Sequence, residues 1–193
     1  MSEKSVQKRK FILETAKTVF AEKGFRSVTM KDIVEACEIS RGGLYLYFSS
    51  TEEIFLEVLT MESEETDEAF GRSLENASAS EVLAMILKEQ KRDILRAKKT
   101  LMAATYEYFF AEQTVKKDNF LKKQFNQAVK MLEKLINMGI ANNEFYDVDA
   151  RIAAKNIMYV LEGLKISALT MGVSGETIDK ELLILMQGLV VEE

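Results

Sequence analysis

The sequence predicts an all-α protein, and three observations support this fold class. Its 193 residues contain no proline and only nine glycines, so long helices meet few interruptions. Hydrophobic residues make up 47% of the chain, which is ample for a core. They recur at the three- and four-residue spacing that places side chains on one helix face. Length alone allows one large domain or two small ones. The division we expect is an N-terminal three-helix domain joined to a larger C-terminal helical domain.

The first helix is expected from Lys8 to Lys23, where Gly24 provides a stop. Its inner stripe would consist of Ile12, Ala16, Val19 and Phe20. Four basic residues crowd the N-terminus, and they would form either an arm that follows phosphates or a frayed, solvated end. These residues are Lys4, Lys8, Arg9 and Lys10.

Residues 29–48 are interpreted as two short helices joined by a tight turn. Thr29 is a good N-cap for the first helix, and Asp32 stands where it can complete a capping box. Ser40 caps the second helix, whose first turn contains two glycines. A nearly bare helix start with free N–H groups suits a phosphate or a groove edge, which favours a DNA-reading helix-turn-helix. A hairpin that only packs is the alternative, although each glycine costs a short helix roughly 1 kcal/mol.

Within the second of these helices, apolar and aromatic residues point in different directions. Leu44 and Phe48 lie four residues apart and can both face inward. This spacing leaves Tyr45 and Tyr47 on other faces of the helix.

Later helices follow from capping signals and composition. Ser50 to Glu53 is expected to form a capping box that opens a fourth helix, which then continues through a solvated acidic stretch at 62–68. The remaining helical segments are expected at Glu81–Arg96, 100–111, Lys117–Ile140, Asp149–Met171 and Thr177–Val191. Lys98 and Lys99 would form a linker.

Charge divides the chain into two parts. Residues 1–50 contain nine Lys/Arg and six Asp/Glu, a balance of +3. Residues 51–193 contain seventeen Lys/Arg and twenty-five Asp/Glu, a balance of −8. We therefore expect a DNA-binding domain at 1–50 and a second domain at 51–193, with the fourth helix joining them rigidly.

A recurring pattern of residues carries a family resemblance. It runs from Ile12–Ala16 and Phe20–Phe25 through the two short helices to Ser50–Ile54, in order and at a characteristic spacing. With these residues the chain resembles the tetracycline-repressor (TetR) family of bacterial transcription regulators. A later segment, Gly139–Ala154, is also similar, with Asn143 in place of a usual glycine. Asparagine tolerates the left-handed conformation almost as well, so the turn should survive.

The resemblance implies a homodimeric transcription regulator, most simply a repressor, that binds a pseudo-palindromic double-stranded DNA operator. A small-molecule effector would release the DNA. Backbone phosphates would contact Thr29, Ser40, Gly42, Tyr45, Tyr47 and Thr51. Base edges would face Arg41, Gly43 and Leu46, and Arg41 is the one long donor suited to bidentate pairing with guanine.

Two positions depart from the family pattern and bear on DNA affinity. The turn reads Cys37-Glu38-Ile39 where Ala-Gly-Val is usual, so a positive φ at Glu38 would cost on the order of 1 kcal/mol. Thr51 stands where a lysine is usual, which removes one cationic contact. These departures bear on affinity more than on function. They are consistent with an alternative function, a helical dimeric ligand-binding or scaffold protein with weak or lost DNA binding.

Aromatic residues and methionines in the C-terminal part are candidates for an effector site. These residues are Met102, Tyr106, Phe109, Phe110, Phe125, Met158, Tyr159 and Glu162. Apolar helix faces with one or two polar groups can line a ligand cavity, so the effector would be largely apolar. It would carry a cationic group if Glu162 or Glu107 faces inward. Core packing explains the same residues equally well.

The dimer interface is expected on the last two helices, as the resemblance implies. Apolar stripes at helical spacing support it. They comprise Leu182, Leu185, Met186 and Leu189 on one helix and Ile152, Asn156, Tyr159 and Gly163 on the other. The alternative is that these stripes close the core of the monomer.

Several functional classes find no support in the sequence. The chain has no histidine, so the usual triad base and the commonest metal ligand are missing, and no glycine-rich phosphate loop is present. We therefore expect no catalytic residues, no metal site, no cofactor and no enzymatic activity. A single cysteine excludes an internal disulfide framework. No apolar run approaches the roughly 20 residues of a membrane span, and no signal peptide is evident, so a cytoplasmic location is expected.

Overall fold

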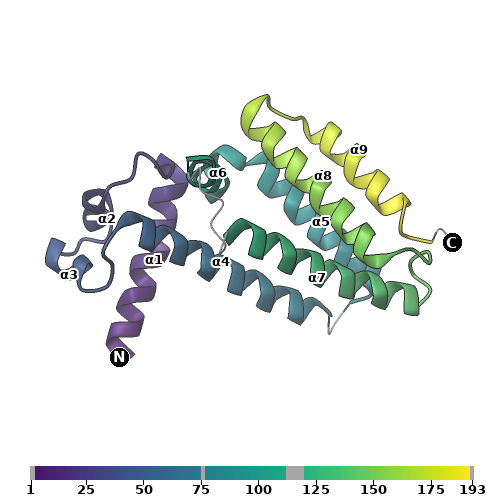
Figure 1. Cartoon of the computed structure of the whole chain (residues 1–193), viewed down its shortest axis with the longest axis horizontal. Helices are drawn as coiled ribbons and strands as arrows, with labels where there is room; N and C mark the ends of the chain where they lie inside the picture. Colours follow the sequence, from purple (N-terminus) through teal and green to yellow (C-terminus); the bar gives the residue numbers. More distant parts are fainter. Residues whose placement is uncertain (1–2, 75–76, 112–119, 192–193) are drawn as a thin grey trace. The chain divides into compact units, whose positions relative to one another are not determined.

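The computed structural model describes residues 3–74, 77–111 and 120–191, and this part of the chain is almost entirely α-helical (Figure 1). The all-α prediction is confirmed. In chain order the elements are α1 (Glu3–Lys23), α2 (Met30–Ala36), α3 (Arg41–Tyr45), α4 (Thr51–Leu74), α5 (Ala79–Leu95), the short 3-10 helix η1 (Ala97–Lys99), α6 (Leu101–Ala111), α7 (Phe120–Ala141), α8 (Ala150–Thr170) and α9 (Gly175–Gln187). None of the helices in these ranges combines the length and apolar character that crossing a bilayer requires.

The chain forms two compact units, each assembled from two segments. The first unit contains Met1–Asp67 and Lys98–Thr114, and the second contains Glu68–Ala97 and Val115–Glu193. The first unit thus extends past residue 50 into α4 and takes in α6. It follows that α4 contributes residues to both units.

The core of the first unit brings together α1 to α4 and α6. The expected inner stripe of α1 is buried, as are Leu44, Phe48 and the stripe of α4 at Ile54, Phe55, Val58 and Leu59. Phe55 packs against Phe20 and Phe25, with ring centroids 4.8 and 4.9 Å apart. The ring of Tyr108 from α6 joins this cluster, 4.8 Å from Phe25. Edge-to-face contacts of this kind stabilise a core beyond the area they bury.

Helix α1 begins at Glu3, five residues before the expected start at Lys8. The basic cluster therefore lies on the first turns of a helix, which contradicts the frayed end among the two alternatives. Its contact with phosphates stays a prediction. Helical geometry places Lys8 over the ring of Phe11, at 4.9 Å, and Lys10 beside Glu14, at 3.8 Å. These local contacts favour the helix over a frayed end.

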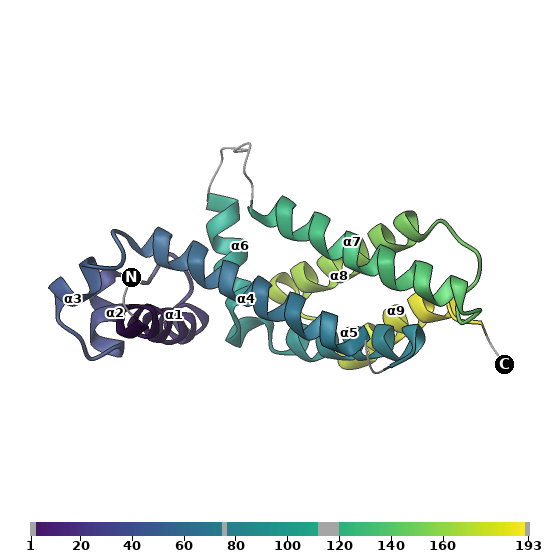
Figure 2. The same ribbon diagram turned by 90° about the horizontal axis from the view of Figure 1, so that it is seen from below.

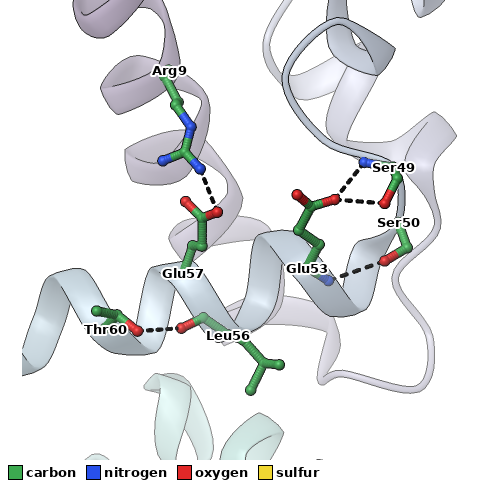
Figure 3. Close-up of polar contacts among 7 residues, drawn as sticks. All are labelled: Arg9, Ser49, Ser50, Glu53, Leu56, Glu57 and Thr60. Atoms are coloured by element: carbon green, nitrogen blue, oxygen red, sulfur yellow. Dashed lines mark hydrogen bonds and ion pairs between the residues drawn. The ribbon is translucent and has the colours of Figure 1, made fainter.

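The start of α4 is capped differently from the expected box (Figure 3). Ser50 Oγ accepts a hydrogen bond of 3.1 Å from the N–H of Glu53, as predicted. The Glu53 carboxylate, however, accepts from the N–H and the hydroxyl of Ser49, both at 2.6 Å. The reciprocal bond therefore closes one residue further back, and these hydrogen bonds lower the pKa of Glu53.

The second unit packs α5, α7, α8 and α9 around an apolar core (Figure 2). Ser78 and Glu81 form a capping box, so α5 begins at Ala79 rather than at Glu81. Ser174 caps α9, which therefore begins at Gly175 rather than at Thr177 and ends at Gln187. The helix expected to begin at Lys117 corresponds to α7, and its expected start lies outside the described residues.

The turn between α7 and α8 is fixed by close packing. Asn143 has a φ of 60°, the left-handed conformation expected for it. A Cβ on Gly139 would come within 2.3 Å of the ring of Phe145, so only glycine fits there. Glu144 then accepts hydrogen bonds of 3.3 and 2.9 Å from the N–H groups of Ala79 and Ser80 at the start of α5. This turn thereby ties α7 and α8 to α5.

Candidate nucleic-acid interface

The first helix of the motif, α2, begins with the predicted capping box. Thr29 Oγ1 accepts a hydrogen bond of 3.3 Å from the N–H of Asp32, and the N–H of Thr29 donates to Asp32 Oδ2 at 2.8 Å. Lys23 at the end of α1 also forms an ion pair with Asp32. The hydrogen bonds from Lys23 and then Thr29 hold the pKa of Asp32 well below its usual range. The start of α2 is thus fixed to the end of α1.

The turn between α2 and α3 contains a strained residue. Glu38 has a φ of 52°, the positive value considered for this position because the family that the sequence resembles usually has glycine there. The strain costs a non-glycine residue on the order of 1 kcal/mol. The preceding residue, Cys37, is buried, and burial raises the pKa of its thiol. Cys37 therefore acts as a small core residue beneath the turn.

Helix α3 begins at Arg41, and Ser40 is its N-cap. Ser40 Oγ accepts a hydrogen bond of 3.0 Å from the N–H of Gly43. A Cβ on Gly43 would lie 3.1 Å from that oxygen, whereas a Cβ on Gly42 would meet no atom within 4 Å. Packing within the described chain therefore gives no reason for glycine at position 42.

The outward side of α3 presents an arginine, aromatic rings and a leucine. Leu46 is 83% exposed, and Tyr45 is also exposed, whereas Leu44 and Phe48 are buried on the opposite side. The guanidinium carbon of Arg41 lies 5.5 Å from the centroid of the Tyr45 ring. An arginine and an exposed apolar residue within one short segment suit a groove that offers both hydrogen-bond acceptors and methyl groups.

The remaining predicted DNA contacts lie near α3 in the sequence of elements, and the first unit contains them all. Thr29 and Ser40 are exposed N-caps, Thr51 is the partly buried first residue of α4, and Tyr47 is partly buried just after α3. All nine residues therefore stand in α3, directly after it, or at the starts of α2, α3 and α4.

One member of the basic cluster is engaged inside the unit. Arg9 forms an ion pair with Glu57 of α4 (Figure 3). Its guanidinium also lies 4.8 Å from the centroid of the Phe48 ring. These contacts hold α1 against α4, and the Arg9 guanidinium covers Phe48 just after α3. Sequence analysis missed Glu57 as the partner, because 48 residues separate the pair and the acid lies on an ordinary charged helix.

The candidate effector residues divide between the two units. Met102, Tyr106 and Phe109 are partly buried in α6 of the first unit, where Phe110 is 70% exposed. In the second unit, the rings of Phe125 and Tyr159 lie 5.2 Å apart, Met158 is in the core and Glu162 pairs with Lys165 at 2.9 Å. Glu107 accepts a hydrogen bond of 3.3 Å from the N–H of Arg26 in the first unit. Two surface hollows in the described chain, of about 460 and 310 Å³, have other linings.

Comparison with known proteins places this arrangement in a family. Residues 12–58 match the model of bacterial regulatory proteins of the tetR family, and residues 82–179 match the tetracyclin repressor-like C-terminal domain. The chain is 37% identical over 138 residues to YfiR, an uncharacterized HTH-type transcriptional regulator of Bacillus subtilis (strain 168). That match covers 71% of this chain and 67% of YfiR.

Two further relatives extend the comparison. The regulator QacR of Staphylococcus aureus (strain Mu50) is 39% identical over 57 residues, which is 30% of each chain. The crystal structure of a TetR transcription regulator from Haloarcula marismortui has the same fold, with a TM-score of 0.80 at 17% identity, over 95% of this chain and 96% of that one.

The capped helix pair with an exposed second helix defines a helix-turn-helix DNA-binding transcription regulator. Because both of its parts match the family models, and the second match alone spans half of the chain, this protein belongs to the TetR family of bacterial transcription regulators.

Proposed function

We propose that this chain is a repressor that binds a pseudo-palindromic operator as a homodimer and releases it when a small, largely apolar effector binds. The outward side of α3 carries this proposal, because it is exposed and includes a glycine that the fold does not require. Glycine at position 42 lets the backbone approach a phosphate closely. A cytoplasmic location follows from the proposed DNA target.

The contacts are proposed in two classes. Phosphates contact the residues at the helix starts and the tyrosines, which are Thr29, Ser40, Gly42, Tyr45, Tyr47 and Thr51. Base edges face Arg41, Gly43 and Leu46. Arg41 suits the O6 and N7 acceptors of guanine, and Leu46 suits the methyl group of thymine.

The proposed dimer interface uses exposed apolar residues of α8 and α9. Ile152 and Tyr159 on α8 are 66% and 65% exposed, and Ile184 on α9 is 62% exposed. Gly163 continues the α8 stripe, and a Cβ there would meet no atom within 4 Å, so another backbone has room to approach. Large exposed apolar residues on neighbouring helices favour self-association through an isologous contact.

The predicted stripe on α9 is largely buried and does not contribute to the proposed interface. Leu182, Leu185 and Leu189 are buried in the core of the second unit, and Met186 packs against it. This stripe follows the alternative that the sequence left open, closure of the core of the monomer. The exposed neighbours Leu183 and Ile184 take its place in the proposed interface.

The effector proposal rests on the apolar character of the candidate residues. The rings of Phe125 and Tyr159 lie 5.2 Å apart and tilted in the second unit, and those of Tyr106 and Phe110 stack in α6 at 5.8 Å. Paired aromatic rings offer apolar surfaces to a ligand. A cationic group on the effector would pair with Glu162, which already holds Lys165.

A selection from random duplex DNA tests the proposal. The full chain should enrich an inverted repeat whose half-sites lie about 10 base pairs, one helical turn, or a multiple of that apart. Arg41→Ala should bind the enriched duplex more weakly while its circular dichroism stays helical. No enrichment at low salt would favour the alternative, a ligand-binding or scaffold protein, which the strained Glu38 and the absent lysine at Thr51 support.

A further inference from the structure

We infer that the ring of Tyr45 positions Arg41 for base reading, so that the ring and the hydroxyl of this tyrosine have separable tasks. The inference rests on the proposed DNA-binding function. It makes Tyr45 a residue that influences sequence preference as well as a phosphate contact.

The geometry of α3 brings the two side chains together. Arg41 is the first residue of the helix and Tyr45 is the last, and residues four apart share one face. The guanidinium carbon lies 5.5 Å from the ring centroid, within the range of a cation–π attraction. The two glycines between them carry no side chain and Leu44 is buried on the other side, so no neighbouring side chain within α3 competes for the contact.

The position of Arg41 in the helix is otherwise unfavourable. A cation in the first turn meets the positive end of the helix dipole. Within the described part of the chain Arg41 takes part in no ion pair. Of its interactions there, the contact with the Tyr45 ring is the one that orients the guanidinium.

A guanidinium held over an aromatic ring is well prepared to recognise a base. The ring attracts the cation without accepting hydrogen bonds in its plane, so the N–H edge stays available. That edge is the part that pairs with the O6 and N7 atoms of guanine. Without the ring, the long side chain of Arg41 would be mobile in the free protein. Binding to DNA would then have to order it, and this entropy cost would lower affinity for the correct base pair. The tyrosine hydroxyl, at the far end of the ring, remains available for a phosphate.

Two substitutions at one position separate the two tasks. Tyr45→Phe keeps the ring and removes the hydroxyl, whereas Tyr45→Leu keeps an apolar side chain and removes the ring. The wild-type chain first selects a duplex from a random library, and Arg41→Ala identifies the base pair whose preference depends on Arg41. Each variant is then titrated against the selected duplex and against duplexes changed at that base pair.

Tyr45→Phe should weaken binding to all these duplexes by the same factor. Tyr45→Leu should in addition reduce the preference at the Arg41 base pair by about two- to fivefold, the value of an exposed cation–π contact. In the Arg41→Ala background, Tyr45→Leu should change the preference no further. Tyr45→Met is a second ring-free variant, and thermal unfolding establishes that each variant is folded.

Full preference in both ring-free variants would overturn the inference, and so would an equal loss of preference in Tyr45→Phe. A wild-type chain that enriches no sequence would overturn the proposed DNA binding itself. That result is obtained before any Tyr45 variant is compared, so the two failures are distinguishable.

Discussion

The hydroxyl of Tyr108 donates a hydrogen bond of 2.7 Å to Oε1 of Glu52, although 56 residues separate them in the sequence. Glu52 is the second residue of α4 and follows Thr51, a proposed phosphate contact. The ring of Tyr108 is buried against Phe25 and Phe55. Helix α6 therefore supplies both apolar packing and a polar contact to the first unit.

Tyr108→Phe should lower the stability of the first unit while leaving its packing intact. A hydrogen bond to a partly exposed carboxylate contributes about 1 kcal/mol, which corresponds to a decrease in Tm of about 2–4 °C for a chain of this size. Differential scanning calorimetry measures the shift. Tyr146→Phe, at an exposed tyrosine of the second unit, is the matched control. Equal Tm values for Tyr108→Phe and wild type would show that the bond contributes nothing.

Gly42→Ala should stabilise the fold and weaken DNA binding. Alanine in a helix is more favourable than glycine by about 1 kcal/mol, and the added methyl group meets no atom of the chain. The same methyl group would hold a phosphate away from the backbone. Calorimetry and fluorescence anisotropy with the selected duplex test the two effects.

Gly43→Ala provides the comparison for Gly42→Ala, since its methyl group would lie 3.1 Å from the capping oxygen of Ser40. This variant should gain less stability than Gly42→Ala, because the hydroxyl of Ser40 must shift to admit the methyl group. Undiminished affinity in Gly42→Ala would mean that the backbone at position 42 does not approach DNA.

Thr51→Lys should restore the cationic contact that the family pattern includes. One added phosphate contact steepens the slope of log K against log salt concentration by about 0.9. Titrations of the selected duplex between low and moderate salt measure the slope, and Thr60→Lys, at an exposed position of α4, controls for net charge. If both variants gave the same slope, the start of α4 would not be the site of the contact.

Ile184→Glu and Leu185→Glu should have different effects, although the residues are adjacent. Ile184 is exposed in the proposed interface, so a glutamate there should yield a folded monomer that no longer binds the operator. Leu185 is buried in the core, so a glutamate there should destabilise the second unit by about 3 kcal/mol or more. Sedimentation equilibrium and thermal unfolding distinguish the two results. A dimeric Ile184→Glu variant would remove this part of α9 from the interface.

Acid should weaken the junction of α1 and α2. The pKa of Asp32 is depressed by hydrogen bonds from Lys23 and then Thr29, so its stabilisation is present above the unfolded pKa of about 3.9. It is lost as the pH falls from about 4 towards the folded-state value, and Asp32→Asn should remove this part of the pH dependence. Urea midpoints measured between about pH 2 and pH 7 give the profile, with Asp147→Asn as control. Parallel profiles for wild type and Asp32→Asn would contradict the assignment.

The helices were predictable because their signals are local. Caps such as Thr29 and Ser40, and stripes such as that of α1, depend on residues within two turns of each other. The left-handed conformations of Glu38 and Asn143 could be anticipated only through the family resemblance, because glycine is usual at both turn positions.

Long-range relationships were not predictable from the sequence. The stripe at Leu182 and Leu185 is equally suited to a core and to an interface, and only the position of α5 and α8 decides between them. The pairing of Arg9 with Glu57, and the placement of α6 in the first unit, depend on chain folding over 48 residues and more. Periodicity identifies which face of a helix is apolar but not which neighbour covers it.

The passage of the chain from the second unit into α6 and back has a consequence for protein engineering. No single cut releases the DNA-binding part in one intact piece, because a fragment ending near Asp67 lacks Tyr108 and leaves the rings of Phe25 and Phe55 without their partner. An isolated DNA-binding domain would require Leu101–Ala111 to be joined to that fragment through a new linker. The same helix could instead be added in trans as a peptide.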